Sequence, residues 1–187
     1  MKKARKKIAL MLVITLVLSF NVAYAATDAE IKAANQLFIL DIYRGYSDGT
    51  LKLDNNINRA EITTLLIRTL GYEDKNIVPD KSKSFTDIRD NHWAKKNIEK
   101  AVALKLVTGY EDLTFKPENN ISFSEVMALM VRAVYKGEVT GKWPYNYIDK
   151  AKELGIIENT DTTDPNQIVT RGQVALFIWK TLLVDIG

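Results

Sequence analysis

The chain has 187 residues, with 26 Lys and Arg against 23 Asp and Glu, and a formal charge of +3. Five basic side chains lie within residues 2–7 and no acidic one lies before residue 28, so residues 26–187 carry 21 basic and 23 acidic side chains and a net charge of −2. The basic charge of the whole chain therefore comes from its first residues and is no evidence for nucleic-acid binding, which requires a clustered basic face. The absence of cysteine excludes thiolate nucleophiles and cysteine-bound zinc.

Residues 1–25 have the pattern of a secretory signal peptide. A positive start precedes an uncharged apolar run over residues 8–20, and Ala23-Tyr24-Ala25 places small residues where signal peptidase reads them. We expect cleavage after Ala25 and export of the remaining chain. The alternative is an uncleaved anchor, but the apolar run is shorter than the roughly 20 residues that span a bilayer. No later stretch is long enough to span, so no membrane contact is expected after cleavage.

Residues 26–75 predict a helix, a turn-rich loop and a second helix. The loop segment Gly45-Tyr46-Ser47-Asp48-Gly49 is typical of turns. The second helix opens at Ile57-Asn58-Arg59-Ala60-Glu61, where a small polar residue precedes Glu by three positions as in a capping box. The apolar positions follow helical spacing. They are Ile31, Ala34, Leu37, Phe38 and Ile42 in the first helix and Ile62, Leu65, Leu66 and Leu70 in the second.

Residues 84–136 and 141–187 repeat this organisation. The helix-opening segment recurs at residues 121–125 and again at residues 169–173. Trp93 and Trp143 mark the start of the preceding helices, and stripes of apolar residues follow in each helix. Those of the last two helices are Val126, Leu129, Met130, Ala133 and Val134, and Val174, Phe177, Ile178 and Leu182. A unit of about 50 residues buries little surface alone, so we expect an all-α fold in which three helix–loop–helix repeats share one core.

These motifs closely resemble the repeat of the S-layer homology family. That repeat reads approximately Phe-x-Asp, Trp-Ala, a helix, Gly-Tyr-x-Asp-Gly-x-Phe-x-Pro and Thr-Arg-Ala-Glu at the start of a second helix. The resemblance covers nearly all of residues 28–184. The matching residues are Gly45, Tyr46, Asp48, Gly49, Arg59, Ala60 and Glu61 in the first unit; Phe85, Asp87, Trp93, Ala94, Gly109, Tyr110, Asp112, Phe115, Pro117 and Glu125 in the second; and Trp143, Thr170 and Arg171 in the third.

The resemblance implies a pseudo-threefold bundle that is secreted and located at the cell surface and cell wall. Family members anchor proteins by binding an anionic secondary cell-wall polysaccharide, often carrying a pyruvate ketal, in grooves between repeats. No cofactor, metal or catalytic activity is implied. The sequence departs from the family pattern at three positions: Phe123 replaces an arginine, Ala29 a tryptophan and Asn159 a loop glycine. If each groove needs the full set, we expect one or two competent grooves rather than three.

Arg59 and Arg171 are the predicted anion contacts. Each directly follows an expected N-cap, where a helix carries partial positive charge and unpaired N–H groups. A cation is disfavoured there unless an anion neutralises both, and a guanidinium can fork onto the two oxygens of a carboxylate. The alternative is that both arginines are solvated or pair with a nearby Asp.

Trp93 and Trp143 are expected to wall the groove by stacking on a sugar ring. Packing in the core is the favoured role for the bulk of each ring. We expect Gly45 and Gly109 to relieve backbone strain and to let a ligand approach the main chain. Trp179 is expected to pack.

Other chemistries find little support. His92 stands alone, so zinc binding is not expected and solvent exposure is the simpler interpretation. The segment around Asp48 and Asp54 lacks the ligand pattern of an EF-hand and indicates a turn. No catalytic motif marks an enzyme. The alternative to polysaccharide binding is an exported scaffold of the same fold that has lost this activity and docks another exported protein.

Overall fold

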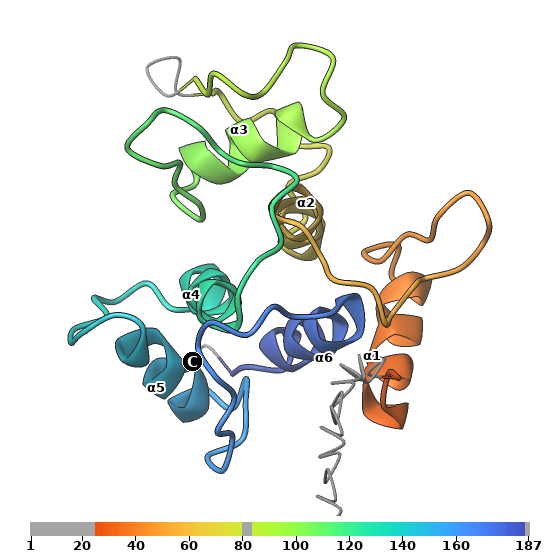
Figure 1. Cartoon of the computed structure of the whole chain (residues 1–187), viewed down its shortest axis with the longest axis vertical. Coiled ribbons are helices and arrows are strands. Elements are labelled where there is room, and N and C mark those ends of the chain that lie inside the picture. The colour runs from red at the N-terminus through yellow and green to blue at the C-terminus, as the bar shows by residue number, and fades with distance from the viewer. Residues whose placement is uncertain (1–24, 80–83, 186–187) are drawn as a thin grey trace, which may run out of the picture.

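The structure is a computed structural model that describes residues 25–79 and 84–185. The described residues form six helices and no strand, which confirms the expected all-α class (Figure 1). The helices are α1 (Asp28–Ile39), α2 (Arg59–Thr69), α3 (Lys95–Ala103), α4 (Phe123–Val134), α5 (Tyr145–Glu153) and α6 (Arg171–Leu182). None of these six is long and apolar enough to cross a bilayer. The predicted signal peptide lies outside the described residues except for Ala25.

The second helix of each unit begins where the sequence predicts. In α2, α4 and α6 the N-cap side chain accepts a hydrogen bond from the backbone N–H three residues later, and the side chain of that later residue accepts one from the N-cap N–H. The pairs are Asn58 with Glu61, Ser122 with Glu125 and Thr170 with Gln173. These reciprocal bonds are capping boxes, and they fix one oxygen of each acidic side chain at its helix start.

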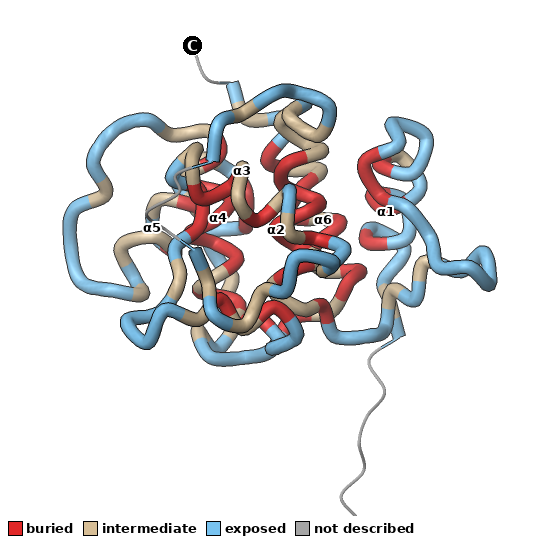
Figure 2. Tube along the Cα trace, turned by 90° about the horizontal axis from the view of Figure 1, so that it is seen from above, coloured by how far each residue is buried: buried red, intermediate tan, exposed pale blue. Residues whose placement is uncertain are grey.

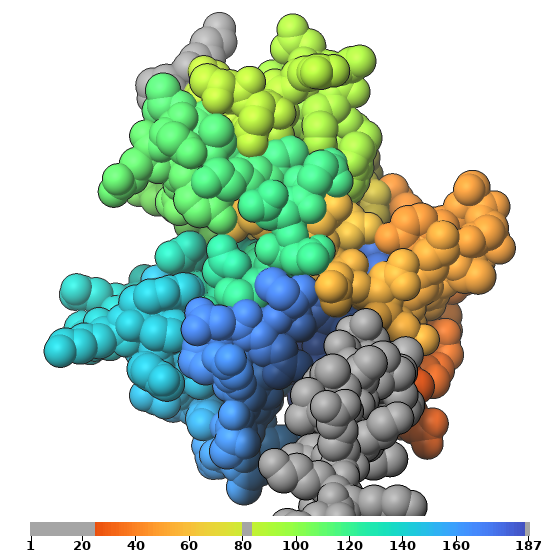
Figure 3. Space-filling view, viewed as in Figure 1, coloured from red at the N-terminus to blue at the C-terminus, as the bar shows by residue number. Residues whose placement is uncertain are grey.

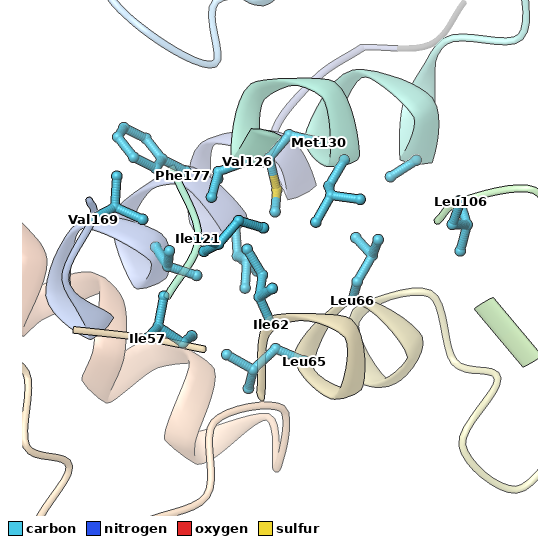
Figure 4. Close-up of a cluster of buried hydrophobic side chains, with 14 of the residues drawn as sticks. Ile57, Ile62, Leu65, Leu66, Leu106, Ile121, Val126, Met130, Val169 and Phe177 are labelled. Carbon is cyan, nitrogen blue, oxygen red and sulfur yellow. The ribbon is translucent and has the colours of Figure 1, made fainter. Parts of the chain in front are cut away.

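Three apolar residues close a ring at the centre of the molecule. The N–H of Ile57 donates to the carbonyl of Val169 at 3.2 Å, that of Val169 to Ile121 at 3.3 Å, and that of Ile121 to Ile57 at 3.3 Å. Each side chain is at most 1% exposed. Figure 4 shows the three side chains pointing into one apolar cluster. A closed ring of equivalent bonds relates the three units by a pseudo-threefold axis, as the resemblance implies.

Each first helix packs on the second helix of a neighbouring unit. In space α1 lies against α6, α3 against α2, and α5 against α4, while α2 and α4 both contact α6 (Figure 1). The loop of each unit therefore carries the chain from one helix pair to the next. This exchange makes the three units one body, because no unit has its own helix pair. Figure 2 shows the buried residues gathered on the facing sides of the helices.

The predicted apolar stripes form most of one core, with exceptions on α1 and at the end of α6. The stripe residues of α2 and α4 are buried or partly buried, and Trp179 packs against the core as expected. In α1, however, Ile31 and Phe38 are 42% and 57% exposed, and in α6 Leu182 is 39% exposed. The expectation that these three belong to the core was wrong. The described contacts of α1 are with α6, so the buried side of α1 is narrow; its buried residues are Glu30, Ala33, Ala34 and Leu37.

Candidate functional site

Two grooves on the surface contain all six predicted site residues. Groove A has a lining that includes Gly45, Tyr46, Glu61, Arg68, Trp93 and Arg171, and its volume is about 350 Å³. Groove B has a lining that includes Arg59, Gly109, Tyr110, Glu125, Arg132 and Trp143, and its volume is about 260 Å³. Both volumes are near the lower end of the range for small-molecule sites.

Each groove takes its arginine, glycine and tryptophan from three different units. Groove A combines Gly45 of the first unit, Trp93 of the second and Arg171 of the third. Groove B combines Arg59 of the first unit, Gly109 of the second and Trp143 of the third, so each contribution is shifted by one unit. Segments of all three units meet around the centre of the space-filling view (Figure 3). The grooves therefore exist only in the assembled bundle.

The three departures from the family pattern fall at the same remaining position. A third groove, related to grooves A and B by the same pseudo-threefold axis, would take its arginine from the second unit, its glycine from the third and its tryptophan from the first. Those places hold Phe123, Asn159 and Ala29. Phe123 is 1% exposed and packs edge-on against Phe177 at 5.8 Å, so it contributes to the core. The losses are thus concentrated in one position, and grooves A and B keep the complete set.

The two predicted arginines occupy equivalent ion pairs between units. Arg171 Nη1 lies 3.0 Å from Glu61 Oε1 and its Nε donates to the carbonyl of Leu51 at 2.9 Å. Arg59 Nη1 lies 3.1 Å from Glu125 Oε1 and its Nε donates to the carbonyl of Phe115 at 2.9 Å. The partner is the capping-box glutamate of the next unit in the ring, rather than the Asp that the sequence suggested. Each arginine therefore also joins two units.

Tyrosine rings cover both guanidinium groups. The guanidinium of Arg171 lies 4.8 Å from the ring centre of Tyr46, and that of Arg59 lies 4.9 Å from the ring centre of Tyr110. The hydroxyl of Tyr46 donates to Glu61 Oε1 at 2.8 Å. Burial and this bond to a carboxylate both raise the pKa of Tyr46. Stacking and ion pairing hold each arginine in one orientation at its groove.

Both tryptophans lie open to solvent beside a groove. Trp93 is 59% exposed and Trp143 is 54% exposed, so the expectation that most of each ring packs in the core was wrong. Each precedes its helix by two residues, where the chain has not yet joined the helix pair. Trp143 meets Tyr147 edge-on at 6.0 Å and Trp93 lies 5.9 Å from the ring of His92. Their free faces suit stacking against a sugar ring.

The two glycines serve close approach and do not relieve backbone strain. Neither has a positive φ, in contrast to Gly49 at 79° in the same loop as Gly45. A Cβ on Gly109 would lie 2.1 Å from the Phe85 ring and 2.8 Å from the carbonyl oxygen of Thr114. A Cβ on Gly45 would lie 3.1 Å from the carbonyl oxygen of Thr50. The expected strain relief was therefore wrong, and the absence of a side chain lets these loops close on themselves.

The sequence reasoning missed three further residue types in each groove. These are the partner glutamates, the tyrosines, and an arginine seven positions after each glutamate: Glu61, Tyr46 and Arg68 in groove A, and Glu125, Tyr110 and Arg132 in groove B. A spacing of seven places two side chains on one face of a helix, two turns apart. Because Glu and Arg recur at this spacing in α2 and α4, the sequence could have indicated which face of each helix lines a groove.

The remaining candidates are structural. His92 is largely buried rather than solvated: its side chain is 15% exposed and its Nδ1 accepts a hydrogen bond from the N–H of Ala94. Asp48 accepts bonds from the N–H and hydroxyl of Thr50, so it forms the turn that the sequence indicated. The hydrogen bond from the Thr50 hydroxyl, followed by the one from the Thr50 N–H, lowers the pKa of Asp48 to about 2. No group of acidic or histidine side chains in the described residues could hold a metal ion.

Comparison with known proteins identifies the family of the second and third units. A model of the S-layer homology domain matches residues 84–127 and 139–175. The chain is 34% identical over 161 residues to the Middle cell wall protein of Brevibacillus brevis and 31% identical over 137 residues to the Surface layer protein of Brevibacillus choshinensis. It is 26% identical over 155 residues to the Cellulosome-anchoring protein of Acetivibrio thermocellus.

The chain spans a small part of these relatives. The three matches cover 85%, 73% and 74% of this chain, but only 15%, 12% and 35% of the relatives. An Endoglucanase of a Bacillus species is 27% identical over 94% of this chain and 19% of its own length. The matching segment is therefore a module that occurs in proteins of several kinds.

Proposed function

The chain belongs to the S-layer homology domain family, and on this premise we propose that it binds an anionic secondary cell-wall polysaccharide in grooves A and B. It is a cell-surface protein with an anchoring role. The polymer that we propose carries pyruvate ketals, whose carboxylates supply the negative charge. The binding is non-covalent and no reaction is catalysed.

The observation that carries the proposal is the assembly of two complete residue sets. Six residues that are far apart in the sequence meet as two groups, each with a guanidinium, an exposed indole and a loop glycine. An exposed indole offers an apolar face to a sugar ring. A guanidinium recognises a carboxylate through two parallel hydrogen bonds. Together they match a polymer that is both saccharide and anion.

The internal ion pairs fix the orientation of the two arginines before a ligand arrives. Arg59 and Arg171 have side chains only 12% and 5% exposed, and both are held by a glutamate and a backbone carbonyl. A ligand that meets an immobilised guanidinium does not have to order it, and the entropy cost of binding falls. In this proposal the arginines are fixed walls of the grooves, and Gly45 and Gly109 let the loops beside them close tightly.

The relatives support an anchoring function and give no support to catalysis by this segment. Proteins named for the cell wall, the surface layer and cellulosome anchoring share it. The Endoglucanase shares it over only 19% of its length, so its activity is not transferred to this chain. The alternative, an exported scaffold that docks a protein, predicts that cell walls are not bound.

The proposal is tested by replacing both exposed tryptophans. We expect the Trp93→Ala, Trp143→Ala variant to lose about tenfold or more of its affinity for purified cell walls in a cosedimentation assay, since each groove loses its stacking surface. The unfolding temperature should hardly change because both rings are more than half exposed. Tyr145→Ala removes an equally exposed ring outside both grooves and is the matched control. Undiminished pelleting of the double variant would contradict the proposal.

A further inference from the structure

Grooves A and B differ in the bonding partners of one equivalent arginine. Arg68 of α2 and Arg132 of α4 occupy equivalent places, seven residues after the capping-box glutamate. Both line their grooves. The comparison of their partners shows that the two grooves do not carry the same charge.

In groove A the additional cations are neutralised within the protein. Arg68 Nε lies 2.8 Å from Glu73 Oε1. Arg44, which lines the same groove, donates to both carboxylate oxygens of Glu73 at 3.1 and 2.8 Å. It also pairs with Asp41 at 2.8 Å. Glu73 therefore forms a carboxylate bridge between two guanidinium groups, the role that a ligand carboxylate would take.

The turn that ends α2 delivers Glu73 to this place. Gly71 has a φ of 70°, its N–H donates to the carbonyl of Arg68, and the N–H of Tyr72 donates to the carbonyl of Ile67. This is a Schellman motif, which reverses the chain at the helix end. Burial alone would raise the pKa of Glu73, but Arg68 and then Arg44 hold it below its ordinary value. The bridge is therefore charged at neutral pH.

Helix α4 ends differently and supplies no such carboxylate. Its C-cap, Tyr135, is extended with ψ of 122°, and the residue 64 positions after Glu73 is Gly137. Arg132 makes two long hydrogen bonds of 3.4 Å, to the hydroxyl of Tyr147 and the carbonyl of Leu106. Its guanidinium also lies 5.1 Å from the Tyr147 ring centre. Among the described residues it has no ion pair with a carboxylate.

The charges of the two grooves follow from these pairs. In groove A, the positive charges of Arg44, Arg68 and Arg171 are balanced by Asp41, Glu61 and Glu73. In groove B, Glu125 balances Arg59, and Arg132 is left over. Groove B thus has one net positive charge at a half-buried guanidinium, where screening by water is weaker than at the surface.

We infer that the two grooves are functionally unequal: Arg132 makes groove B the primary site for a carboxylate on the polysaccharide, and Glu73 holds groove A in a self-neutralised form. A ligand carboxylate reaching groove A has to displace Glu73 from Arg68 and Arg44, whereas one reaching Arg132 has no competitor. This inference rests on the proposed function, and it adds the identity of the stronger groove and the residue that weakens the other.

The test is isothermal titration of the exported chain with a synthetic 4,6-O-(1-carboxyethylidene) hexopyranoside. Its methyl ester, which has no charge, is the ligand control. We expect the wild type to bind the acid at one dominant site, and Arg132→Gln to weaken that site at least about tenfold, equivalent to about 1.4 kcal/mol. Glu73→Gln keeps the shape of the side chain but removes its charge, and it should add a second site of similar affinity.

Two further variants keep the result interpretable. Arg132→Lys retains the positive charge but cannot form two parallel hydrogen bonds to a carboxylate, and it should lose less affinity than Arg132→Gln. Asp41→Asn gives groove A the same net charge as groove B but leaves Glu73 bridging Arg68 and Arg44. We expect its stoichiometry to match the wild type, because the bridging carboxylate, and not the net charge alone, blocks the site; a second site in this variant would contradict the role of Glu73. Unfolding temperatures establish that each variant is folded.

The outcomes separate the inference from the proposed function. Two equal sites in the wild type, an unchanged stoichiometry in Glu73→Gln, or full affinity in Arg132→Gln would each overturn the inference while leaving carboxylate binding intact. Equal binding of acid and ester would instead contradict the proposed recognition of the carboxylate. Failure of every variant to bind the acid would contradict both.

Discussion

Replacing Arg171 by alanine is expected to lower the free energy of unfolding by about 3–5 kcal/mol, the usual effect of removing one partner of a buried ion pair. The Arg171 side chain is 5% exposed, and its loss removes the cationic partner of Glu61 and the side-chain donor to the carbonyl of Leu51. It also removes the cation that lies 5.0 Å from the buried ring of Tyr43. Since Arg171 belongs to the third unit and Glu61 to the first, the change removes one of the contacts that join these two units.

Urea denaturation of Arg171→Ala and two companion variants measures this effect. Arg59→Ala should cost less, because the Arg59 side chain is 12% exposed and Glu125 is 32% exposed. Arg171→Lys keeps the charge but cannot form the same pair of bonds, and we expect an intermediate loss. A loss below about 1 kcal/mol for Arg171→Ala would show that the pair behaves like an exposed one. Wall binding by the Arg59→Ala, Arg171→Ala double variant is therefore to be measured on folded protein, and retained binding would contradict the proposed role of these arginines.

Truncating a side chain of the central ring should lower the free energy of unfolding by a similar amount. Ile57→Ala is expected to lower the free energy of unfolding by about 2–5 kcal/mol, because the side chain is fully buried where the three units meet and its removal leaves a cavity. The backbone bonds of Ile57 to Val169 and Ile121 remain possible, so the loss measures packing.

The matched control for this variant is Ile31→Ala. Ile31 carries the same side chain but is 42% exposed on α1, and its truncation should change stability by about 0.5 kcal/mol or less. Unfolding of Ile57→Ala should remain a single transition followed equally by circular dichroism and tryptophan fluorescence, since no unit keeps its own helix pair. Equal losses for the two variants, or separate transitions for separate units, would contradict a shared core.

The local features of the fold could be predicted from the sequence, and the pairing of helices could not. Capping boxes at Asn58, Ser122 and Thr170 depend on residues three positions apart, and the structure has all three. Which helix lies against α1 depends on contacts with α6, more than 100 residues later. Hydrophobic spacing alone therefore placed Ile31 and Phe38 in the core, although α1 is covered by a neighbour on one narrow side.

The same limit applies to the grooves. Arg59 and Arg171 could be placed at helix starts, because the N-cap precedes them directly. Their partners Glu125 and Glu61 belong to other units, and in the sequence each arginine stands closest to the glutamate or glutamine of its own helix. The exposure of the two tryptophans likewise depends on how the linkers enter the helix pairs, which no local spacing encodes.

The most direct test of wall anchoring through a pyruvylated polymer is cosedimentation with cell walls before and after chemical removal of the pyruvate ketal. The exported chain should pellet with untreated walls and remain in the supernatant with treated walls, and the Trp93→Ala, Trp143→Ala variant should remain in the supernatant with both. Equal pelleting of the wild type with treated and untreated walls would contradict recognition of the ketal. Failure to pellet with either would favour the exported scaffold that docks another protein.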